Sequence, residues 1–228
     1  MSKKTIKRPE FFTKEYWKNN WKIILINLAI YLSVFIAGSL IDLLTKKYIY
    51  HTGYQGSSPE YVVYSSGFIR FWSVFHAGTT IELGLGNVGL HIISILIMAG
   101  TLFITLFFKD KGYRWTIAAL ALVSAGSFGN MYDRFAFGGV RDIINLPWAN
   151  YGTFNFADMW LVLGAIAALL SIIILVLISS IRNKKNKANE IDEDEAKTIE
   201  SVSFDSENKT NTVINNQSQT IDDPNHNF

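Results

Sequence analysis

Two aspartates, Asp142 and Asp158, have the residue type and the spacing to act together on a peptide bond. The segment between them contains Pro147 and Gly152, and such a loop can fold back so that the two carboxylates meet. Two carboxylates that share one site do not ionise together easily, so one of them keeps a proton. The ionised member can then activate water, while the protonated member polarises the carbonyl and later protonates the leaving amine. Such a site needs no metal ion, cofactor, serine or cysteine.

Amide and guanidinium side chains accompany the two aspartates. The stretch "GNMYDR" places Asn130, Asp133 and Arg134 on one face of a helix, because they are related by i+3 and i+4. The stretch "FNFADMW" places Asn155 one helical face from Asp158. We expect Asn130, Arg134 and Asn155 to orient the aspartates or the substrate backbone. Asp133 has a second interpretation, a purely structural salt bridge with Arg134.

Two other interpretations of the acidic residues remain open at this point. Asp42, Asp133, Asp142 and Asp158 all fall at or near the ends of apolar runs, so they could be ordinary loop carboxylates beside water. They could also bind ions in a small transporter or channel. A transporter would place charges near the middle of its spans and often carries repeats. The acids here gather at one boundary, and the sequence has no internal repeat, which favours the hydrolytic interpretation.

Long apolar runs must position these residues. Apolar residues make up 49% of the chain and gather in runs of about twenty, the length that crosses a hydrocarbon core of ~30 Å. Backbone groups in lipid must be satisfied within the segment, so such runs form helices. We predict an all-α membrane protein with four transmembrane helices, at about 23–43, 88–108, 113–132 and 159–181.

The distribution of charge predicts the orientation of these helices. Lysine and arginine gather before the first run, in the loop "KDKGYRW" and after the fourth run. The positive-inside rule places these three regions, and hence both termini, in the cytoplasm. Segments 44–87 and 133–158 then lie outside. The first run is too long for a cleavable signal, so we expect it to remain as an anchor.

Composition divides the chain into three parts. Residues 1–22 are expected to form a basic cytoplasmic N-terminus, 23–182 the membrane domain, and 183–228 a disordered acidic cytoplasmic tail. Within the outer segment 44–87, aromatic and β-branched residues suit short strands. An aromatic belt at the membrane interface would explain the same composition. The chain has no cysteine, which excludes a disulfide or thiolate site of its own.

Several of these stretches together resemble the lipoprotein signal peptidase family, the type II signal peptidases. The family pattern reads G-N-x-x-D-R, V-x-D and F-N-x-A-D, and "GNMYDR", "VRD" and "FNFAD" follow one another here in that order. Upstream, "DLLTK" is similar to the family's D-Q-x-T-K, and "FHAGTTIELG" to its N-x-G-x-A-F-G region. The resemblance covers about residues 23–182.

The resemblance implies a role for each matching position. It makes Asp142 and Asp158 the catalytic aspartates, with other residues supporting them or binding substrate. Those residues are Asn130, Asp133, Arg134, Asn155, Asp42, Lys46, His76 and Gly78. The implied fold is four membrane helices with a small extracytoplasmic β-cradle, which agrees with the composition.

The resemblance also implies a reaction and a place in the cell. The protein would be an aspartic endopeptidase that removes signal peptides from prolipoproteins by cutting before the diacylglyceryl-modified cysteine. It would be a monomer in the bacterial cytoplasmic membrane, with its active site at the extracytoplasmic face. Its partners would be diacylated prolipoproteins and membrane lipids, with no nucleic acid and no cofactor.

The sequence departs from the family pattern in the outer pocket. Leu43 replaces a glutamine, His76 an asparagine, Thr79 and Thr80 two alanines, and Glu82 a small residue. His76 could donate a hydrogen bond to substrate or could be a tolerated polar loop residue. A non-catalytic lipoprotein-binding relative is disfavoured because both aspartates are present. The stretch 47–67 and the acidic tail are expected to be additions to the family core.

Overall fold

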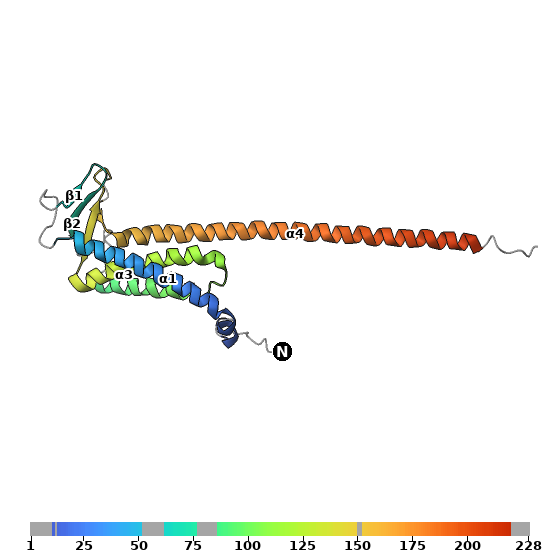
Figure 1. Cartoon of the computed structure of the whole chain (residues 1–228), viewed down its shortest axis with the longest axis horizontal. Coiled ribbons are helices and arrows are strands. Elements are labelled where there is room, and N and C mark those ends of the chain that lie inside the picture. The colour runs from blue at the N-terminus through green and yellow to red at the C-terminus, as the bar shows by residue number, and fades with distance from the viewer. Residues whose placement is uncertain (1–10, 12, 52–61, 77–85, 150–151, 220–228) are drawn as a thin grey trace, which may run out of the picture. The chain divides into compact units, whose positions relative to one another are not determined.

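The computed structural model is mostly helical, with one small antiparallel sheet at an end of the helices (Figure 1). It describes residues 11, 13–51, 62–76, 86–149 and 152–219. In chain order the elements are α1 (Lys14–Ile49), β1 (Tyr64–Ser65), β2 (Arg70–His76), α2 (Asn87–Thr105), the 3-10 turn η3 (Lys111–Tyr113), α3 (Arg114–Phe137), β3 (Val140–Asn145), β4 (Thr153–Phe154) and α4 (Phe156–Gln219).

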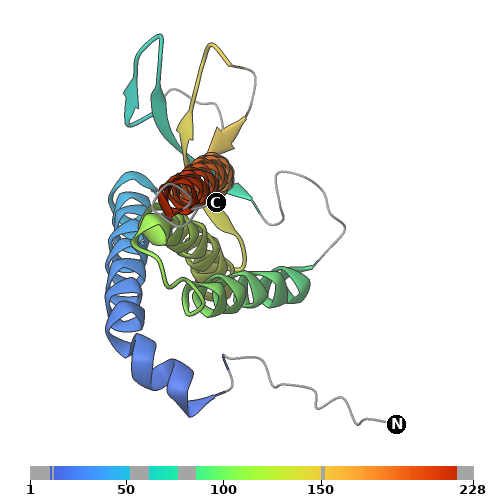
Figure 2. The ribbon, with the colours of Figure 1, turned by 90° about the vertical axis from the view of Figure 1, so that its right-hand side faces the viewer.

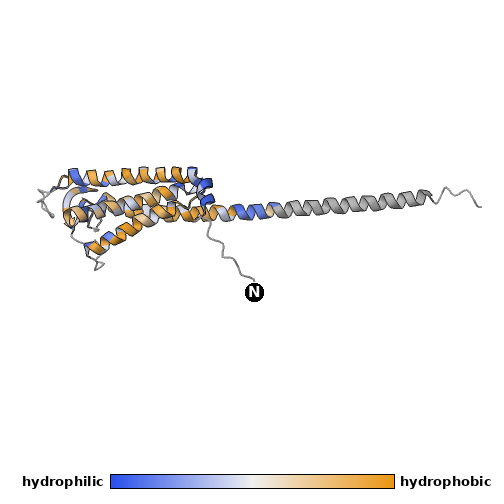
Figure 3. Cartoon of the chain, turned by 90° about the horizontal axis from the view of Figure 1, so that it is seen from below, coloured by the Kyte–Doolittle hydropathy of each residue, from blue (hydrophilic) through white to orange (hydrophobic). Residues whose placement is uncertain are grey.

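Three helices in the described part of the chain are long and apolar enough to cross a membrane: α1, α2 and residues 156–189 of α4. Apolar residues cover much of their length (Figure 3). Three of the four predicted spans therefore coincide with helices of this length and composition, and the four-span arrangement stays a prediction. The predicted third run forms the helix α3. Its glycine, serine and other polar residues make α3 less apolar than the other three helices.

Helix α3 packs against both α1 and α2, and the three helices lie side by side in Figure 2. A buried polar seam joins them. The Tyr31 hydroxyl of α1 contacts Thr101 of α2 at 2.9 Å and also Ser124 of α3. Between apolar helices such interhelical hydrogen bonds and small residues take over the role that hydrophobic burial has in water.

Small residues bring α3 close to the first turns of α4. A Cβ atom added to Gly126 would lie 2.3 Å from the Ala157 carbonyl oxygen, and one added to Gly164 would lie 2.8 Å from that of Ala119. Real Cβ atoms do not approach backbone this closely, so both positions require glycine. The close approach sets the start of α4 beside the end of α3.

The sheet has the strand order β1-β2-β3-β4, with every neighbouring pair antiparallel. Short strands were one of two interpretations of the outer segment 44–87, which supplies β1 and β2, and the small sheet implied by the family resemblance is present. Asp142 was not expected inside a strand, but it lies in β3, opposite Val74 of β2. The reason is that α3 ends at Gly138, whose φ of 81° lets the chain turn directly into the strand.

The chain divides into two compact units, residues 1–175 and 176–228. The described residues of the predicted site all belong to the first unit. In the second, α4 continues as a helix to Gln219, where the sequence favours a disordered tail from residue 183. Lysine, alanine and glutamate between 183 and 200 are good helix formers, which gives the helix a local reason to continue. The disorder of this tail stays a prediction.

Candidate active site

The first turn of α4 begins with a reciprocal cap. The Asp158 backbone N–H donates to Oδ1 of Asn155 at 3.0 Å, and the Asn155 backbone N–H donates to Oδ2 of Asp158 at 3.3 Å. This is the capping-box arrangement, in which the residue before the helix and the third residue inside it satisfy each other. The Ala157 N–H, also unpaired within the helix, donates to Oδ1 of Asp42 at 2.8 Å. The polar "FNFAD" stretch therefore starts the helix.

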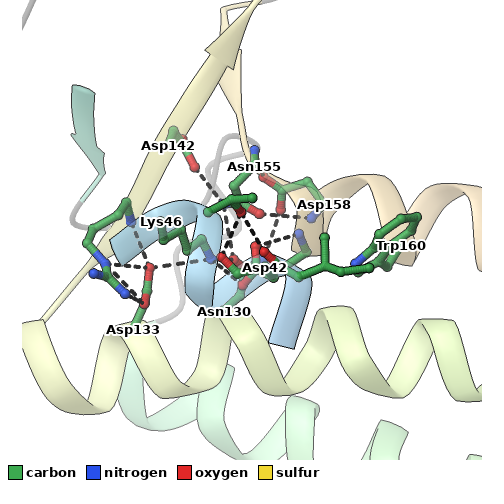
Figure 4. A network of polar contacts seen from close by, with 12 residues as sticks. Asp42, Lys46, Asn130, Asp133, Asp142, Asn155, Asp158 and Trp160 are labelled. Carbon is green, nitrogen blue, oxygen red and sulfur yellow. Dashed lines mark hydrogen bonds and ion pairs between the residues drawn. The ribbon is translucent and has the colours of Figure 1, made fainter. Parts of the chain in front are cut away.

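Asp142 reaches the same asparagine from β3 (Figure 4). The Asn155 side-chain amide donates to Oδ1 of Asp142 at 2.7 Å, and Oδ2 of Asp142 lies 3.3 Å from Nε2 of His76. Asp142 is 2% exposed. This burial, and next the negative charge of Asp158, raise the pKa of Asp142 from 3.8 to about 7. Asn155 thus joins two carboxylates that come from a strand and from a helix.

Asn130 of α3 supports the pair from the other side. Its Nδ2 donates to Oδ1 of Asp158 at 2.7 Å, while its Oδ1 accepts from Asn155 at 3.2 Å and from Lys46 at 3.3 Å. The ammonium group has no acceptor, so it fixes which end of the Asn130 amide faces α1. The NH2 group of Asn130 must then face Asp158.

A buried charge cluster adjoins the amides (Figure 4). Lys46 contacts Oδ2 of Asp42 at 2.8 Å and Oδ2 of Asp133 at 3.4 Å. Asp133 in turn accepts from the guanidinium of Arg141 at 2.7 Å and from its backbone N–H at 3.0 Å. The two carboxylates and two cations cancel in charge, which is the condition for burying such groups. The cluster ties the end of α1 to α3 and β3.

Gly129 makes room for this cluster. A Cβ atom at position 129 would lie 2.3 Å from Oδ2 of Asp42, the oxygen that accepts from Lys46. The glycine of "GNMYDR" is therefore required by the close approach of the Asp42 carboxylate to the α3 backbone.

The structure brings most of the predicted site residues together. Asp42, Lys46, Asn130, Asp133, Asn155 and the two aspartates form one connected network, and Arg134 joins it by donating to the Asn130 carbonyl at 3.2 Å. Asp133, for which a structural salt bridge was one interpretation, pairs with Lys46 and Arg141. His76 contacts Asp142 directly. Gly78, Thr79, Thr80 and Glu82 lie outside the described residues.

Leu43, which replaces the glutamine of the family pattern, lies on α1 next to Asp42 in the sequence. It lines a cavity of about 230 Å³ between α1 and α3, which also touches β3. The lining residues are Leu40, Leu43, Leu44, Lys47, Tyr132, Phe137 and Arg141. Neither aspartate of the pair lines this cavity.

Arg141 was not singled out from the sequence. It occupies the unspecified position of the "VRD" motif, next to Asp142. Because neighbouring residues of a strand point to opposite faces, a strand at this position sends Arg141 away from Asp142. If Asp142 had been predicted inside a strand, Arg141 would have been expected to face a group on the opposite side of that strand. In the structure this group is Asp133.

The network can be compared with known proteins. Residues 34–175, which include every member of the network, match the family model described as signal peptidase (SPase) II. The chain belongs to the signal peptidase II family. Two lipoprotein signal peptidases are among its relatives. The protein from Pelagibacter ubique is 31% identical over 161 residues, covering 67% of this chain and 90% of its own length. The protein from Microcystis aeruginosa is 30% identical over 138 residues, covering 60% and 87%.

Solved structures show the same fold. One bacterial membrane enzyme superposes with a TM-score of 0.54 at 24% identity, over 68% of this chain and 90% of its own. Because the chain belongs to this family and has three helices apolar enough to cross a membrane, the protein is a membrane peptidase. The resemblance noted from its motifs is thereby confirmed at the level of the family.

Proposed function

We propose that this protein is an aspartic endopeptidase that removes signal peptides from prolipoproteins by cutting before the diacylglyceryl-modified cysteine. The family membership supports the peptidase activity and the class of substrate. One observation carries the catalytic type: the carboxylates of Asp142 and Asp158 are both held by Asn155, one by its side chain and one by its backbone.

The proposed roles of the two aspartates differ. Asp142 carries the shared proton, which is supported by its burial and by its pKa of about 7. Asp158 is the ionised base, supported by its place in the first turn of α4, where a helix attracts negative charge. Asp158 takes a proton from the attacking water, while Asp142 polarises the carbonyl by donating a hydrogen bond to its oxygen and transfers its proton only later, to the leaving amine. The pair again holds one proton, which now lies on Asp158. Asn130 and Asn155 hold both carboxylates in place during these transfers.

The proposed membrane arrangement has four spans, with α3 as the fourth crossing helix. A helix that faces α1, α2 and the start of α4 contacts little lipid, so it needs less hydropathy than its neighbours. Both termini are cytoplasmic by the positive-inside rule, and the site faces the other side. A lipid-modified precursor then enters sideways from the bilayer and presents its scissile bond at the interface, where water reaches it.

The experiment for this proposal uses two synthetic precursors that differ in one group. One carries the diacylglyceryl group on its cysteine and the other carries a free thiol. The purified protein is incubated with each in mixed micelles, and the products are analysed by mass spectrometry. We expect cleavage of the lipidated precursor on the amino side of the cysteine and negligible cleavage of its twin. Equal cleavage of both, or cleavage at another bond, contradicts the proposal.

A further inference from the structure

His76 lies beside the pair because of the strand register. Val74 of β2 is directly opposite Asp142 of β3, and His76 is two residues further along β2. Residues two apart on a strand share a face, so His76 and Asp142 are diagonal neighbours on the same side of the sheet. Nε2 of His76 consequently lies 3.3 Å from Oδ2 of Asp142.

The two partners of Asp142 differ in kind. Oδ1 of Asp142 accepts from the neutral amide of Asn155, whereas Oδ2 meets an imidazole that can gain a proton. The His76 side chain is 41% exposed, whereas that of Asp142 is 3% exposed. Histidine at this position departs from the asparagine of the family pattern, and an asparagine side chain does not titrate.

Titratable groups from α1, α3 and α4 lie near Asp142 and set the conditions for this contact, among them the neutral phenol of Tyr50 at the end of α1. Asp158 from α4 and Asp133 from α3 disfavour a negative charge on Asp142, while Lys46 from α1 favours it. Arg134, also from α3, is close enough to interact with both carboxylates of the pair. Lys46 and Asp133 are engaged with each other in the buried cluster. A protonated His76 adds one positive charge at the exposed side of Asp142.

We propose that His76 is a positioning residue whose imidazole holds Oδ2 of Asp142 and, when protonated, keeps the Asp142–Asp158 pair at a single proton in mildly acidic conditions. This inference rests on the proposed function of the pair. The pair is active with one proton and inactive with two. A cation within about 4 Å of the pair favours the state with one negative charge over the neutral state with two protons, so the second proton binds to the pair only at lower pH.

The test is the pH profile of kcat/KM on the diacylated precursor for wild type and His76→Asn. Asparagine is the residue that the family pattern has here, and it keeps a polar side chain without a charge. We expect the acid limb of the variant to move up by about half to one pH unit, which is a loss of roughly three- to tenfold near pH 5 and little change near pH 8. His76→Lys, which keeps a cation, should retain the wild-type acid limb. A His76→Asn profile that superimposes on the wild type overturns the inference.

His91→Asn is the matched control. His91 lies in α2, where its ring meets that of Phe135 at a centroid distance of 6.4 Å, so the same chemical change leaves the pair untouched. Its profile should follow the wild type. An acid limb displaced equally in the His91 and His76 variants would also overturn the inference, because the effect would not depend on the contact with Asp142.

A second measurement does not depend on cleavage. We expect the Tm difference between wild type and His76→Asn to change between about pH 5 and pH 8, and to lose this pH dependence in an Asp142→Asn background. A pH-dependent difference that persists without the Asp142 carboxylate contradicts the pairing. If wild type fails to cut the precursor, the proposed function is wrong, while this cycle still decides whether His76 acts on Asp142.

Discussion

Asn155 and Asp158 cap each other at the start of α4, each accepting a hydrogen bond from the backbone N–H of the other. The same Asn155 side chain donates to Asp142 and to Asn130. Starting the helix and positioning the two carboxylates are therefore functions of one residue. This explains why an amide and an acid stand where an apolar helix begins.

The two functions of Asn155 separate on substitution. Serine retains an oxygen that caps the helix but has no N–H group to reach Asp142. We expect Asn155→Ser to lose cleavage by at least tenfold and to have a lower Tm, because the buried oxygens of Asp142 and Asn130 lose the amide donor. Asn155→Ala should lose the cleavage and about 1 kcal/mol more stability than Asn155→Ser, because it also lacks the cap. Full activity of Asn155→Ser, measured on the diacylated precursor, would show that the bridge to Asp142 is dispensable.

Gly129→Ala tests the close approach of α1 and α3. The added methyl group would lie 2.3 Å from Oδ2 of Asp42 and must displace the buried ion pair. We expect a drop of several degrees in Tm and a loss of cleavage. Gly100→Ala in α2 is the control, since a Cβ atom there meets nothing within 4 Å. Alanine is the better helix former, so this variant should be unchanged or slightly more stable. Equal behaviour of the two variants would contradict the packing argument.

Lys46→Met tests the buried charge cluster. The change leaves Asp42 and Asp133 without their shared cation, and breaking a buried ion pair costs about 3–5 kcal/mol. We expect a large fall in the yield of folded protein and in Tm. The neighbouring Lys47 is exposed, so Lys47→Met should have little effect on either measurement. If Lys46→Met were as stable as the wild type, the buried charge cluster would not be needed for the stability of the fold.

The raised pKa of Asp142 predicts how stability depends on pH. The folded protein binds this proton more tightly than the unfolded chain, whose pKa is near 3.8. The stabilisation is therefore complete below about pH 4, falls as the pH rises toward about 7 and is absent above that. Asp142→Asn cannot ionise at this position. The Tm of the variant relative to the wild type should therefore rise as the pH increases from about 4 to about 7, and the variant should have the higher Tm near pH 8. A Tm difference that is independent of pH would contradict the raised pKa.

The sequence predicted the residues of the site better than their contacts. The i+3 and i+4 spacing placed Asn130 and Asp133 on one face of α3, and both are buried in the network. Spacing does not show which charges neutralise each other across the fold. The pairing of Asp133 with Lys46 joins α3 to α1, and that with Arg141 depends on β3 following directly from Gly138.

Two further features of the structure could not be predicted from the residues near each position in the sequence. His76 meets Asp142 only through the β2–β3 register, which is set by pairing between distant segments. Helix α3 has a more polar sequence than the other three helices because it packs against α1 and α2. The sequence of α3 alone does not show which helices surround it. The three more apolar helices were recognisable from their own residues.

The most direct test of the account compares Asp142→Asn and Asp158→Asn with wild type on the diacylated precursor, using kcat/KM as the readout. Asp110→Asn is the control, because Asp110 caps the short turn η3 far along the chain from the pair. We predict a loss of at least a thousandfold, on the order of 4 kcal/mol, for each variant of the pair and none for the control, with all three variants folded. Normal turnover by either Asp142→Asn or Asp158→Asn would contradict the claim that these two carboxylates cut the peptide bond together.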